Sequence, residues 1–525
     1  MYAVLWGHFD IVKILISSGI NIDERNNEGK TALDIAIKYN RNDIINFLKN
    51  NNKKSSNSAY NEEQKIKKKV NAKHYFLAYI GSLPLIKYFI EKNGLNIDKK
   101  DENGLSILLY AIKGGSLDIV KYLIEIKEMK IDDRDNDHWN TLMYACCYGH
   151  FDIAKYLIDN GIDINKKIKK INALMIAIIS DQIDIIKNIN LNEVNDFENE
   201  HNGRNIDLIK YLIKNGADIS IKDSDGRNPL MLASQIGYKT IVEDLIEKGV
   251  NINEVDENGQ NSLIYAIKFN QLNIVKYLIE KNINFEMKDN NGCNSLMHAC
   301  IKDVVKYLIE EKKMNINKKN KNGWNILMYA SANGKRDIVE YLIDIGMDPY
   351  LKDSDGNNSL MNAIINDQLD IVKYLIEEKK MNKNKVNKNN ENIILLASKS
   401  GNINIIRYLI EEKKMPIKYA DAKNKDGENS LLCATKNNNI EIVKYLIDKK
   451  ININKKRKDG MTALMIASKE GYDSIVEFLT SNDKININLK SNEGKTALDY
   501  AKDYGHFNII SILINNRKKK FIIQN

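Results

Sequence analysis

The segment NGWNILMYASANG, residues 322–334, with its continuation RDIVEYLIDIG, residues 336–346, contains the pattern that decides the fold. It begins with Asn-Gly, a tight-turn signal because glycine adopts positive φ without steric cost. Asn325 then stands where an N-cap accepts hydrogen bonds from the first N–H groups of a helix. Gly334 ends this short helix, and Gly346 ends a longer amphipathic one. The segment therefore predicts a turn, a short helix, a second turn and a longer helix.

Imperfect copies of this unit fill nearly the whole chain of 525 residues. An alanine of the first helix, replaced once by leucine, marks each copy, and the commonest interval is 33 residues. These positions are Ala3, Ala36, Leu77, Ala111, Ala145, Ala177, Ala233, Ala266, Ala299, Ala330, Ala363, Ala397, Ala434, Ala467 and Ala501. One unit is too small to bury its own apolar face, so the copies must stack on one another.

A residue that can cap a helix precedes the first helix of nearly every copy. These predicted N-caps are Thr31, Ser106, Asn140, Asn172, Asn228, Asn261, Asn294, Asn325, Asn358, Asn392, Asn429, Thr462 and Thr496. A serine, threonine or asparagine side chain at this place accepts from an otherwise unpaired backbone N–H group. The recurrence inside one chain therefore predicts both the start of each helix and the register of the repeats.

The repeated unit resembles the ankyrin repeat, a 33-residue unit with the pattern T-P-L-H-x-A. The stretches that carry this resemblance are Asn228–Ala233, Ser295–Ala299, Thr462–Ala467 and Thr496–Ala501. Only Pro229 holds the proline of the pattern, and the other copies have Ser, Ala or Ile there. This departure weakens the start of each helix slightly but leaves the cap in place.

The resemblance covers about nine tenths of the chain and implies an all-α ankyrin-repeat solenoid of about fifteen repeats. In that fold, helix-turn-helix units are joined by β-hairpin-like loops into an elongated, curved array. The resemblance also implies that the hairpin tips and the exposed inner, concave face of the first helices bind proteins.

The order of regular and irregular copies predicts a division of the chain into six segments. They are N-terminal repeats at 1–50, a polar linker at 51–70, repeats at 71–190, an insertion or decayed repeat at 191–205, repeats at 206–515, and a basic tail at 516–525. The first copy begins inside its first helix without an N-cap, so we expect a truncated or mis-started chain, with a frayed helix as the alternative. For 191–205, a decayed repeat is favoured over a partner-binding loop.

Composition narrows the class of protein. The net charge is +9, from 79 basic and 70 acidic residues, and the five cysteines form no disulfide framework. The start lacks the features of a signal peptide, and no apolar run is long enough to cross a membrane. We expect a cytoplasmic, monomeric protein without membrane insertion, with a nuclear location left open.

The basic runs 65–69, 166–170, 455–458 and 517–520 could contact nucleic acid, but solvated turns of a lysine-rich protein are favoured.

No arrangement of residues predicts catalysis. Two Gly-Lys-Thr stretches, at 29–31 and 494–496, lack the earlier glycine of a phosphate-binding loop and fall on the turn-and-cap register. Cys293, His298 and Cys300 suggest zinc ligands, but they occupy ordinary repeat positions and no C-x-x-C pair supports a site. We therefore expect no enzyme, no cofactor and no metal.

A variable position follows the turn glycine of each repeat, and this is where partner contacts are expected. It holds Lys30, Leu105, Trp139, Arg227, Gln260, Cys293, Trp324, Asn357, Glu428, Met461 and Lys495. Exposed aromatic residues and arginine supply much of the energy of protein interfaces. We therefore predict partner binding by Trp139, Tyr148, Arg227, Phe269 and Trp324, with packing over the next hairpin as the alternative for the two tryptophans.

The sequence thus predicts a protein–protein interaction scaffold, adaptor or inhibitor that binds one or more proteins on a preorganised surface. Two alternatives remain open. One is a nuclear or nucleic-acid-associated factor that uses the basic runs. The other is the repeat part of a larger protein with an enzyme or channel domain upstream. A recurrent tyrosine of the second helices is predicted to pack between repeats, at Tyr122, Tyr156, Tyr211, Tyr277, Tyr341, Tyr374, Tyr408 and Tyr445.

Overall fold

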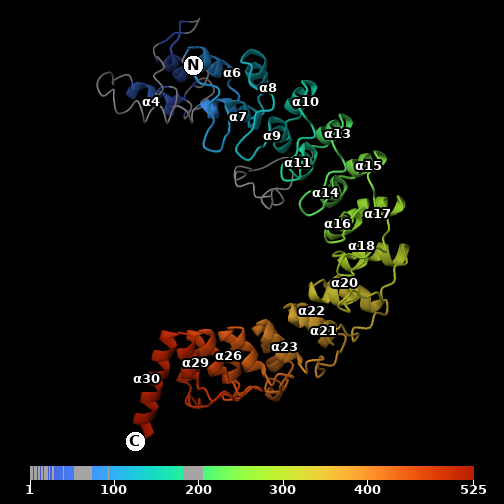
Figure 1. The fold of residues 1–525 in the computed structure, drawn as a ribbon, viewed down its shortest axis with the longest axis vertical. Coiled ribbons are helices and arrows are strands. Elements are labelled where there is room, and N and C mark those ends of the chain that lie inside the picture. The colour runs from blue at the N-terminus through green and yellow to red at the C-terminus, as the bar shows by residue number, and fades with distance from the viewer. Residues whose placement is uncertain are drawn as a thin grey trace. The chain divides into compact units, whose positions relative to one another are not determined.

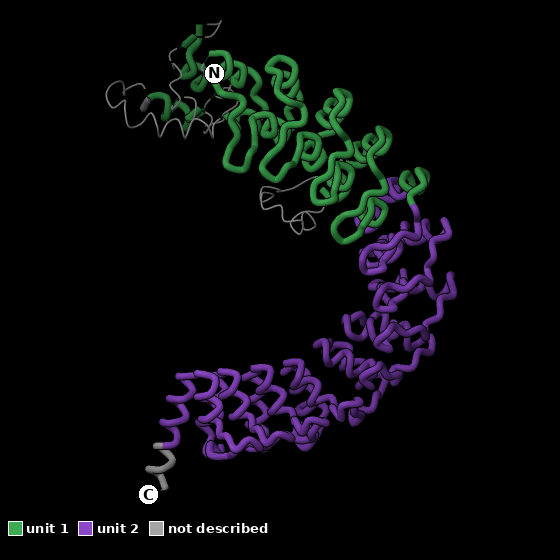
Figure 2. Tube along the Cα trace, in the orientation of Figure 1, with its two compact units in different colours: residues 1–232, 243–250 green, residues 233–242, 251–525 purple. Residues whose placement is uncertain are grey.

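The computed structural model describes residues 29–39, 41–51, 74–92, 94–180 and 205–524, with the single positions 4, 9, 12, 13, 16, 22, 24 and 25. All regular structure in these ranges is helical, and β structure there is limited to isolated bridges such as Arg134–Asn140 and Lys288–Asn294. The chain divides into two compact units (Figure 2). Unit 1 comprises residues 1–232 and 243–250, and unit 2 comprises 233–242 and 251–525. This is an all-α repeat solenoid, as predicted.

Each repeat consists of a first helix and a second helix. The first helices are α3 (Ala32–Lys38), α7 (Ile107–Lys113), α9 (Thr141–Cys147), α11 (Ala173–Ile179), α14 (Pro229–Ile236), α16 (Ser262–Lys268), η2 (Ser295–His298), α19 (Ile326–Ala332), α21 (Ser359–Ile365), α23 (Ile393–Ser400), α25 (Ser430–Lys436), α27 (Ala463–Glu470) and α29 (Ala497–Asp503). Within each unit the first helices form one row and the second helices another (Figure 1).

The second helices are longer or are continued by a wider turn. They are α4 (Asn42–Asn51), α6 (Leu83–Lys92), α8 (Leu117–Lys121) with η1 (Tyr122–Ile126), α10 (Phe151–Asp159), α13 (Ile206–Lys214), α15 (Lys239–Glu247), α17 (Leu272–Glu280), α18 (Lys302–Lys306) with η3 (Tyr307–Glu311), α20 (Arg336–Asp344), α22 (Leu369–Glu377), α24 (Ile403–Arg407) with η4 (Tyr408–Glu412), α26 (Ile440–Asp448), α28 (Asp473–Ser481) and α30 (Phe507–Gln524). A short 3₁₀ turn, η5 (Ile417–Tyr419), lies in one connecting loop.

The N-caps predicted from the sequence are confirmed. Asn325 is extended, and its side chain accepts from the Met328 N–H at 3.0 Å, at the start of α19. Asn140 and Asn429 make the same bond to Met143 and Leu432. These asparagines are almost fully buried, so without the bond a backbone donor would be left unpaired inside the protein.

The core is a narrow band of small and branched apolar residues between the two rows of helices. Ala363, Ala397 and Ala467, at the position that marks the repeat, have no exposed surface. Their small side chains allow neighbouring first helices to approach closely. Accordingly, α19 contacts α21 and α27 contacts α29 in unit 2, while α7, α9 and α11 contact one another in order in unit 1.

The loops between repeats are closed by a buried side-chain oxygen. Asp353 donates its N–H to the Asn357 carbonyl (2.9 Å), and its Oδ1 accepts from the N–H groups of Asp355 (3.0 Å) and Asn357 (2.8 Å). The N–H of Ser354 reaches the Asn322 carbonyl of the preceding loop at 2.9 Å. This loop is therefore a tight hairpin-like tip, as predicted, and it is also hydrogen-bonded to its neighbour.

A glycine is required where successive tips meet. Gly323 has a φ of 77°, in the left-handed region that side chains disfavour. A Cβ added there would lie 2.9 Å from the Ser354 nitrogen of the next tip. The glycine of the Asn-Gly signal thus serves both the turn and the contact between repeats.

The second helix of some repeats ends in a wider turn that accommodates one extra residue. In α17 the Ile283 N–H bonds to the Leu278 carbonyl, five residues back, whereas after η3 the Met314 N–H bonds to the Leu308 carbonyl, six residues back. Ile283 and Met314 are both buried, so the same apolar position is filled despite the insertion. The wider turn is a π turn, with one residue more than an α-helical turn.

The second-helix tyrosines pack between repeats, as predicted. Tyr408 is almost fully buried and donates its hydroxyl to Glu377 of the preceding repeat at 3.0 Å. Tyr445 makes the same contact with Glu411, also at 3.0 Å. Burial, together with the neighbouring glutamate, raises the pKa of both hydroxyls, so they remain donors at neutral pH.

Two irregular repeats differ from the others. In one, the first helix shrinks to the single 3₁₀ turn η2, which compensates for the missing residues before α18. In the other, α11 contacts α13, and Asn205 Nδ2 donates to Ser180 Oγ (2.5 Å), so α13 is the second helix of this repeat.

The predicted linker at 51–70 lies outside the described residues except for Asn51, and the predicted insertion at 191–205 lies outside them except for Asn205. The division into six segments therefore stays a prediction. At the other end, α30 continues to Gln524 through the segment predicted as a basic tail. No helix of the described residues is long and apolar enough to cross a membrane.

The caps yield a test of the repeat frame. Replacing Asn325 with Ala should lower the free energy of unfolding by about 1–2 kcal/mol, because the Met328 N–H loses its acceptor. Urea unfolding followed by circular dichroism measures this change. Asn333→Ala, at the exposed far end of the same helix, is the matched control and should change stability by less than about 0.5 kcal/mol. Equal losses in the two variants would contradict the capping role.

Candidate functional site

Trp139, one of the five predicted partner-binding residues, has only 6% of its surface exposed. Its N–H donates to Asp135 Oδ1 (2.7 Å), and its carbonyl accepts from the Asp135 N–H (3.1 Å). These bonds close the tip and turn the indole against Tyr144, with ring centroids 5.6 Å apart. The expectation that Trp139 is exposed is therefore wrong.

The same closure of the tip reduces the exposure of the residue after the turn glycine in the other repeats. Besides Trp139, five residues at this position are buried: Leu105, Cys293, Asn357, Glu428 and Met461. The half-buried ones are Lys30, Arg227, Gln260, Trp324 and Lys495. The position points inward in many repeats because its N–H must reach the buried acceptor oxygen of the tip. It therefore displays less surface than the sequence suggested.

Two predicted residues, Trp139 and Tyr148, are joined through a third ring in unit 1. Tyr144 lies between them, and its centroid is 6.4 Å from that of Tyr148 with the rings within 20° of parallel. The His150 ring continues this row at 6.2 Å from Tyr148. Tyr148 is half-buried, so part of the row is open to solvent.

The preceding repeats extend this row. Tyr75 and Tyr110 stack with centroids 4.8 Å apart and an interplanar angle of 19°. Lys113 Nζ lies 5.7 Å from the ring centroids of both Tyr110 and Tyr148. A cation at this distance is attracted to each ring. We name the set formed by Tyr75, Tyr110, Lys113, Trp139, Tyr144 and Tyr148 the aromatic face.

Hydrogen bonds to half-buried carboxylates orient two of the rings. The Tyr110 hydroxyl donates to Asp101 Oδ2 (2.8 Å), and the Tyr144 hydroxyl donates to Asp135 Oδ2 (2.6 Å). Burial raises the pKa of Asp135 above its usual range, although the bond from Tyr144 opposes this. Burial and the Asp101 charge raise the pKa of Tyr75. Tyr75 is therefore neutral at physiological pH, and the hydrogen bonds hold the rings of Tyr110 and Tyr144 in fixed orientations.

Sequence reasoning missed Tyr75, Tyr110, Lys113 and Tyr144. A signal was present, because Tyr110 and Tyr144 both occupy the histidine position of the repeat pattern, nine residues after the tip aspartate. The spacing alone did not show that neighbouring repeats bring these rings together.

The other three predicted residues are not part of the aromatic face. Arg227 Nε pairs with Asp223 (2.7 Å), and one of its terminal nitrogens is 3.2 Å from Asp225, so its charge is balanced within its own tip. Phe269 and Trp324 belong to unit 2. Phe269 ends α16 with 46% of its surface exposed, and Trp324 packs edge-on against Tyr329 with centroids 5.0 Å apart.

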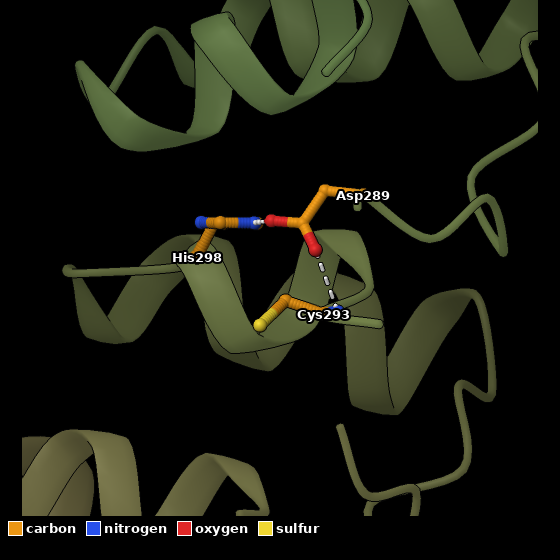
Figure 3. A group of neighbouring side chains, drawn as sticks. All are labelled: Asp289, Cys293 and His298. Atoms are coloured by element: carbon orange, nitrogen blue, oxygen red, sulfur yellow. Dashed lines mark hydrogen bonds and ion pairs between the residues drawn. The ribbon is translucent and has the colours of Figure 1, made fainter. Parts of the chain in front are cut away.

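Among the described residues, one group of side chains has the composition of a metal site: Asp289, Cys293 and His298, with ligand atoms within 4.8 Å of one another. Asp289 Oδ1 accepts from the Cys293 N–H (2.8 Å), and Oδ2 meets His298 Nε2 at 3.0 Å. Figure 3 shows these two contacts and the sulfur directed away from the carboxylate. The sulfur instead lies 3.0 Å from the Tyr329 hydroxyl.

This group has a structural explanation. His298 stands where Tyr144 stands in its repeat, and Asp289 does what Asp135 does there. Burial lowers the pKa of His298, so the neutral ring donates its Nε2 hydrogen to Asp289 at neutral pH. Asp289 closes a tip with the Cys293 N–H and the His298 ring, and this arrangement does not by itself indicate a metal centre.

The structural role of Asp289 can be tested with a residue that other tips of this chain already use at the same position. Asp289→Asn should be nearly neutral for stability, because asparagine supplies the same acceptor oxygen at the tips of Asn320 and Asn387. Asp289→Ala should lower the free energy of unfolding by about 1–3 kcal/mol, since two buried N–H groups lose their acceptor. Thermal unfolding of the three proteins decides this. Stabilisation of the wild type by Zn²⁺ that Cys293→Ser abolishes would instead support a metal centre.

The sequence and fold were compared with known proteins. A family model described as ankyrin repeats (3 copies) matches residues 1–58, 74–168, 199–289, 283–353, 360–457, 416–491 and 451–524. Among solved structures, the human ASB11 ankyrin repeat domain is similar at 20% identity, over 47% of this chain and 100% of that domain, with a TM-score of 0.38. Comparison with curated proteins gave no match.

Ankyrin repeats are generally protein–protein interaction modules and are typically non-enzymatic. The family model matches most of the chain, and the helices, caps and hairpin-like tips follow the same repeat. The chain belongs to the ankyrin-repeat family.

Proposed function

We propose that this chain is a protein–protein interaction scaffold or adaptor that binds a protein partner on the aromatic face of unit 1 and acts without catalysis. The observation that carries the proposal is the pair of ring stacks, Tyr75 with Tyr110 and Trp139 with Tyr144 and Tyr148, which Lys113 bridges across neighbouring repeats. Part-buried hydrogen bonds orient Tyr110 and Tyr144. A partner would meet a preorganised surface, which lowers the entropy that binding must overcome.

The chemistry of the aromatic face suits a protein partner. Tyrosine offers a large, stiff contact area with a polar edge, and such residues dominate the energetics of protein interfaces. Lys113 adds the one positive charge of the set between two ring faces. The remainder of the frame, with its buried caps and alanines, holds the face in place.

The test is capture of proteins from nuclease-treated cell lysate with the full chain. Tyr148→Ala combined with Lys113→Gln removes two half-buried members of the aromatic face and spares the buried Trp139 and Tyr144. We expect at least about tenfold less of a stoichiometric protein partner with this variant than with wild type, because truncating an aromatic anchor commonly weakens binding by that amount.

Tyr88→Ala is the matched control, since Tyr88 is also an exposed aromatic residue of unit 1 but lies on the second helix α6. It should capture the partner like wild type. Equal loss in both variants would contradict the assignment of the face. Capture that survives the face variant but requires nucleic acid would favour the alternative function.

A further inference from the structure

Five consecutive tips of unit 2 are rich in lysine. We name the four-residue segments at 319–322, 352–355, 386–389, 423–426 and 456–459 the basic tips; their sequences are KNKN, KDSD, VNKN, KNKD and KRKD. Four of the five carry a net positive charge. By contrast, the tips at 100–103, 134–137 and 255–258, KDEN, RDND and VDEN, are net negative.

The fold does not require this change of charge. In acidic tips the closing oxygen belongs to an aspartate, such as Asp256, whose Oδ1 accepts from the Asn258 and Gln260 N–H groups at 2.9 and 2.7 Å. In three of the basic tips asparagine does the same, as at Asn424, whose Oδ1 accepts from Asp426 (3.0 Å) and Glu428 (2.8 Å). The tip at 352–355 keeps an aspartate, Asp353, and is the one with a net negative charge. In the tip at 456–459, Arg457 holds this position, and Asp459 Oδ1 accepts from the Met461 N–H (3.1 Å). An amide oxygen therefore satisfies the same N–H groups without a negative charge.

Lysine follows the closing residue in four basic tips, at Lys321, Lys388, Lys425 and Lys458. The fold uses only the backbone of this residue: the Lys388, Lys425 and Lys458 N–H groups donate to a carbonyl of the preceding tip at 2.9, 2.9 and 3.1 Å. All four side chains are exposed, and their ammonium groups make no ion pair with any residue that the structure describes. These charges are thus not explained by the repeat itself.

A second lysine row precedes the closing residue. Lys319, Lys423 and Lys456 each donate Nζ to the backbone carbonyl of the corresponding residue in the next tip, at 3.1, 2.9 and 2.8 Å. These bonds hold the lysines in line and leave their charges uncompensated. In Figure 1 the loops of the C-terminal repeats, orange to red, follow one another along one edge of the unit.

We propose that the basic tips bind an extended acidic segment of a partner protein, laid along the tips from one repeat to the next. Packed helices lie about 8–10 Å apart, which sets the order of the spacing between successive tips. An extended peptide advances about 3.3 Å per residue, so carboxylates at every third position would meet Lys388, Lys425 and Lys458 in turn. The proposal rests on the proposed function insofar as the partner is a protein, but it uses a separate surface.

The composition of the tips favours a peptide over nucleic acid. Surfaces that bind single strands combine positive charge with aromatic rings on which bases stack, and the basic tips contain no aromatic residue. Asp355 and Asp426 are exposed in the same tips and would repel a uniformly charged phosphate backbone. A peptide backbone can instead offer N–H donors to these carboxylates between its acidic side chains.

The test uses the full chain and a fluorescently labelled peptide of fifteen residues with glutamate at every third position and Gly/Ser between. Fluorescence anisotropy at low and physiological ionic strength measures its affinity. The triple variant Lys388→Gln, Lys425→Gln, Lys458→Gln should bind about tenfold more weakly, the combined effect of three exposed ion pairs. Affinity should also fall as salt rises.

The matched control is Lys313→Gln, Lys414→Gln, Lys450→Gln, which removes the same charge from exposed lysines at the ends of second helices in unit 2. We expect less than a twofold change. Equal weakening by the two triple variants would overturn the proposal, because the binding would then follow net charge alone. A peptide of the same composition with its glutamates in one block should bind less well than the spaced peptide.

Three further outcomes separate this proposal from others. Tighter binding of a single-stranded oligonucleotide of matched charge, lost in the tip variant, would replace the peptide by nucleic acid. Absence of peptide binding, while Tyr148→Ala with Lys113→Gln still loses a captured protein, would refute the basic tips and leave the proposed function intact. Peptide binding without any lysate partner of the aromatic face would do the reverse.

Discussion

A side-chain oxygen at the base of most tips, buried at Asp353, is the constraint on which the rest of the array depends. At Asp353 that oxygen accepts two backbone N–H groups, and the closed tip places Ser354 within hydrogen-bonding distance of the preceding tip. An unpaired buried donor is costly, so the loop has little freedom to open. The first helix that follows is then started by a second buried acceptor, the N-cap, as at Asn358.

This frame leaves different positions free in the two units. The aspartate of an acidic tip has a second oxygen, and in unit 1 that oxygen orients Tyr110 and Tyr144, which makes a row of rings possible. Where asparagine replaces the aspartate, as at Asn424, the tip closes equally well and loses a charge. One substitution that is neutral for the fold thus changes what the surface can recognise. Binding character can vary along the array without altering its architecture.

The fold was largely predictable from the sequence because its determinants are local. The caps, the turn glycines and the alanine positions recur at nearly fixed spacing, and the structure places Asn140, Asn325 and Ala363 as the pattern predicts. The site was less predictable. Trp139 holds the position that follows the turn glycine in other repeats, although His138 precedes it here. The sequence predicts an exposed side chain there, but two hydrogen bonds to Asp135 turn it inward. Contacts between rings of successive repeats, such as Tyr75 with Tyr110, depend on how the repeats stack.

The wider turn at the end of some second helices has a consequence for how such a chain can change over time. Between a second-helix tyrosine and the next cap there are 17 positions from Tyr277 to Asn294 and 18 from Tyr307 to Asn325, yet the residue that closes the turn is buried in both. A codon gained or lost there shifts no helix out of register. At this point of the unit the turn accommodates a one-residue insertion locally, so the neighbouring repeats keep their packing.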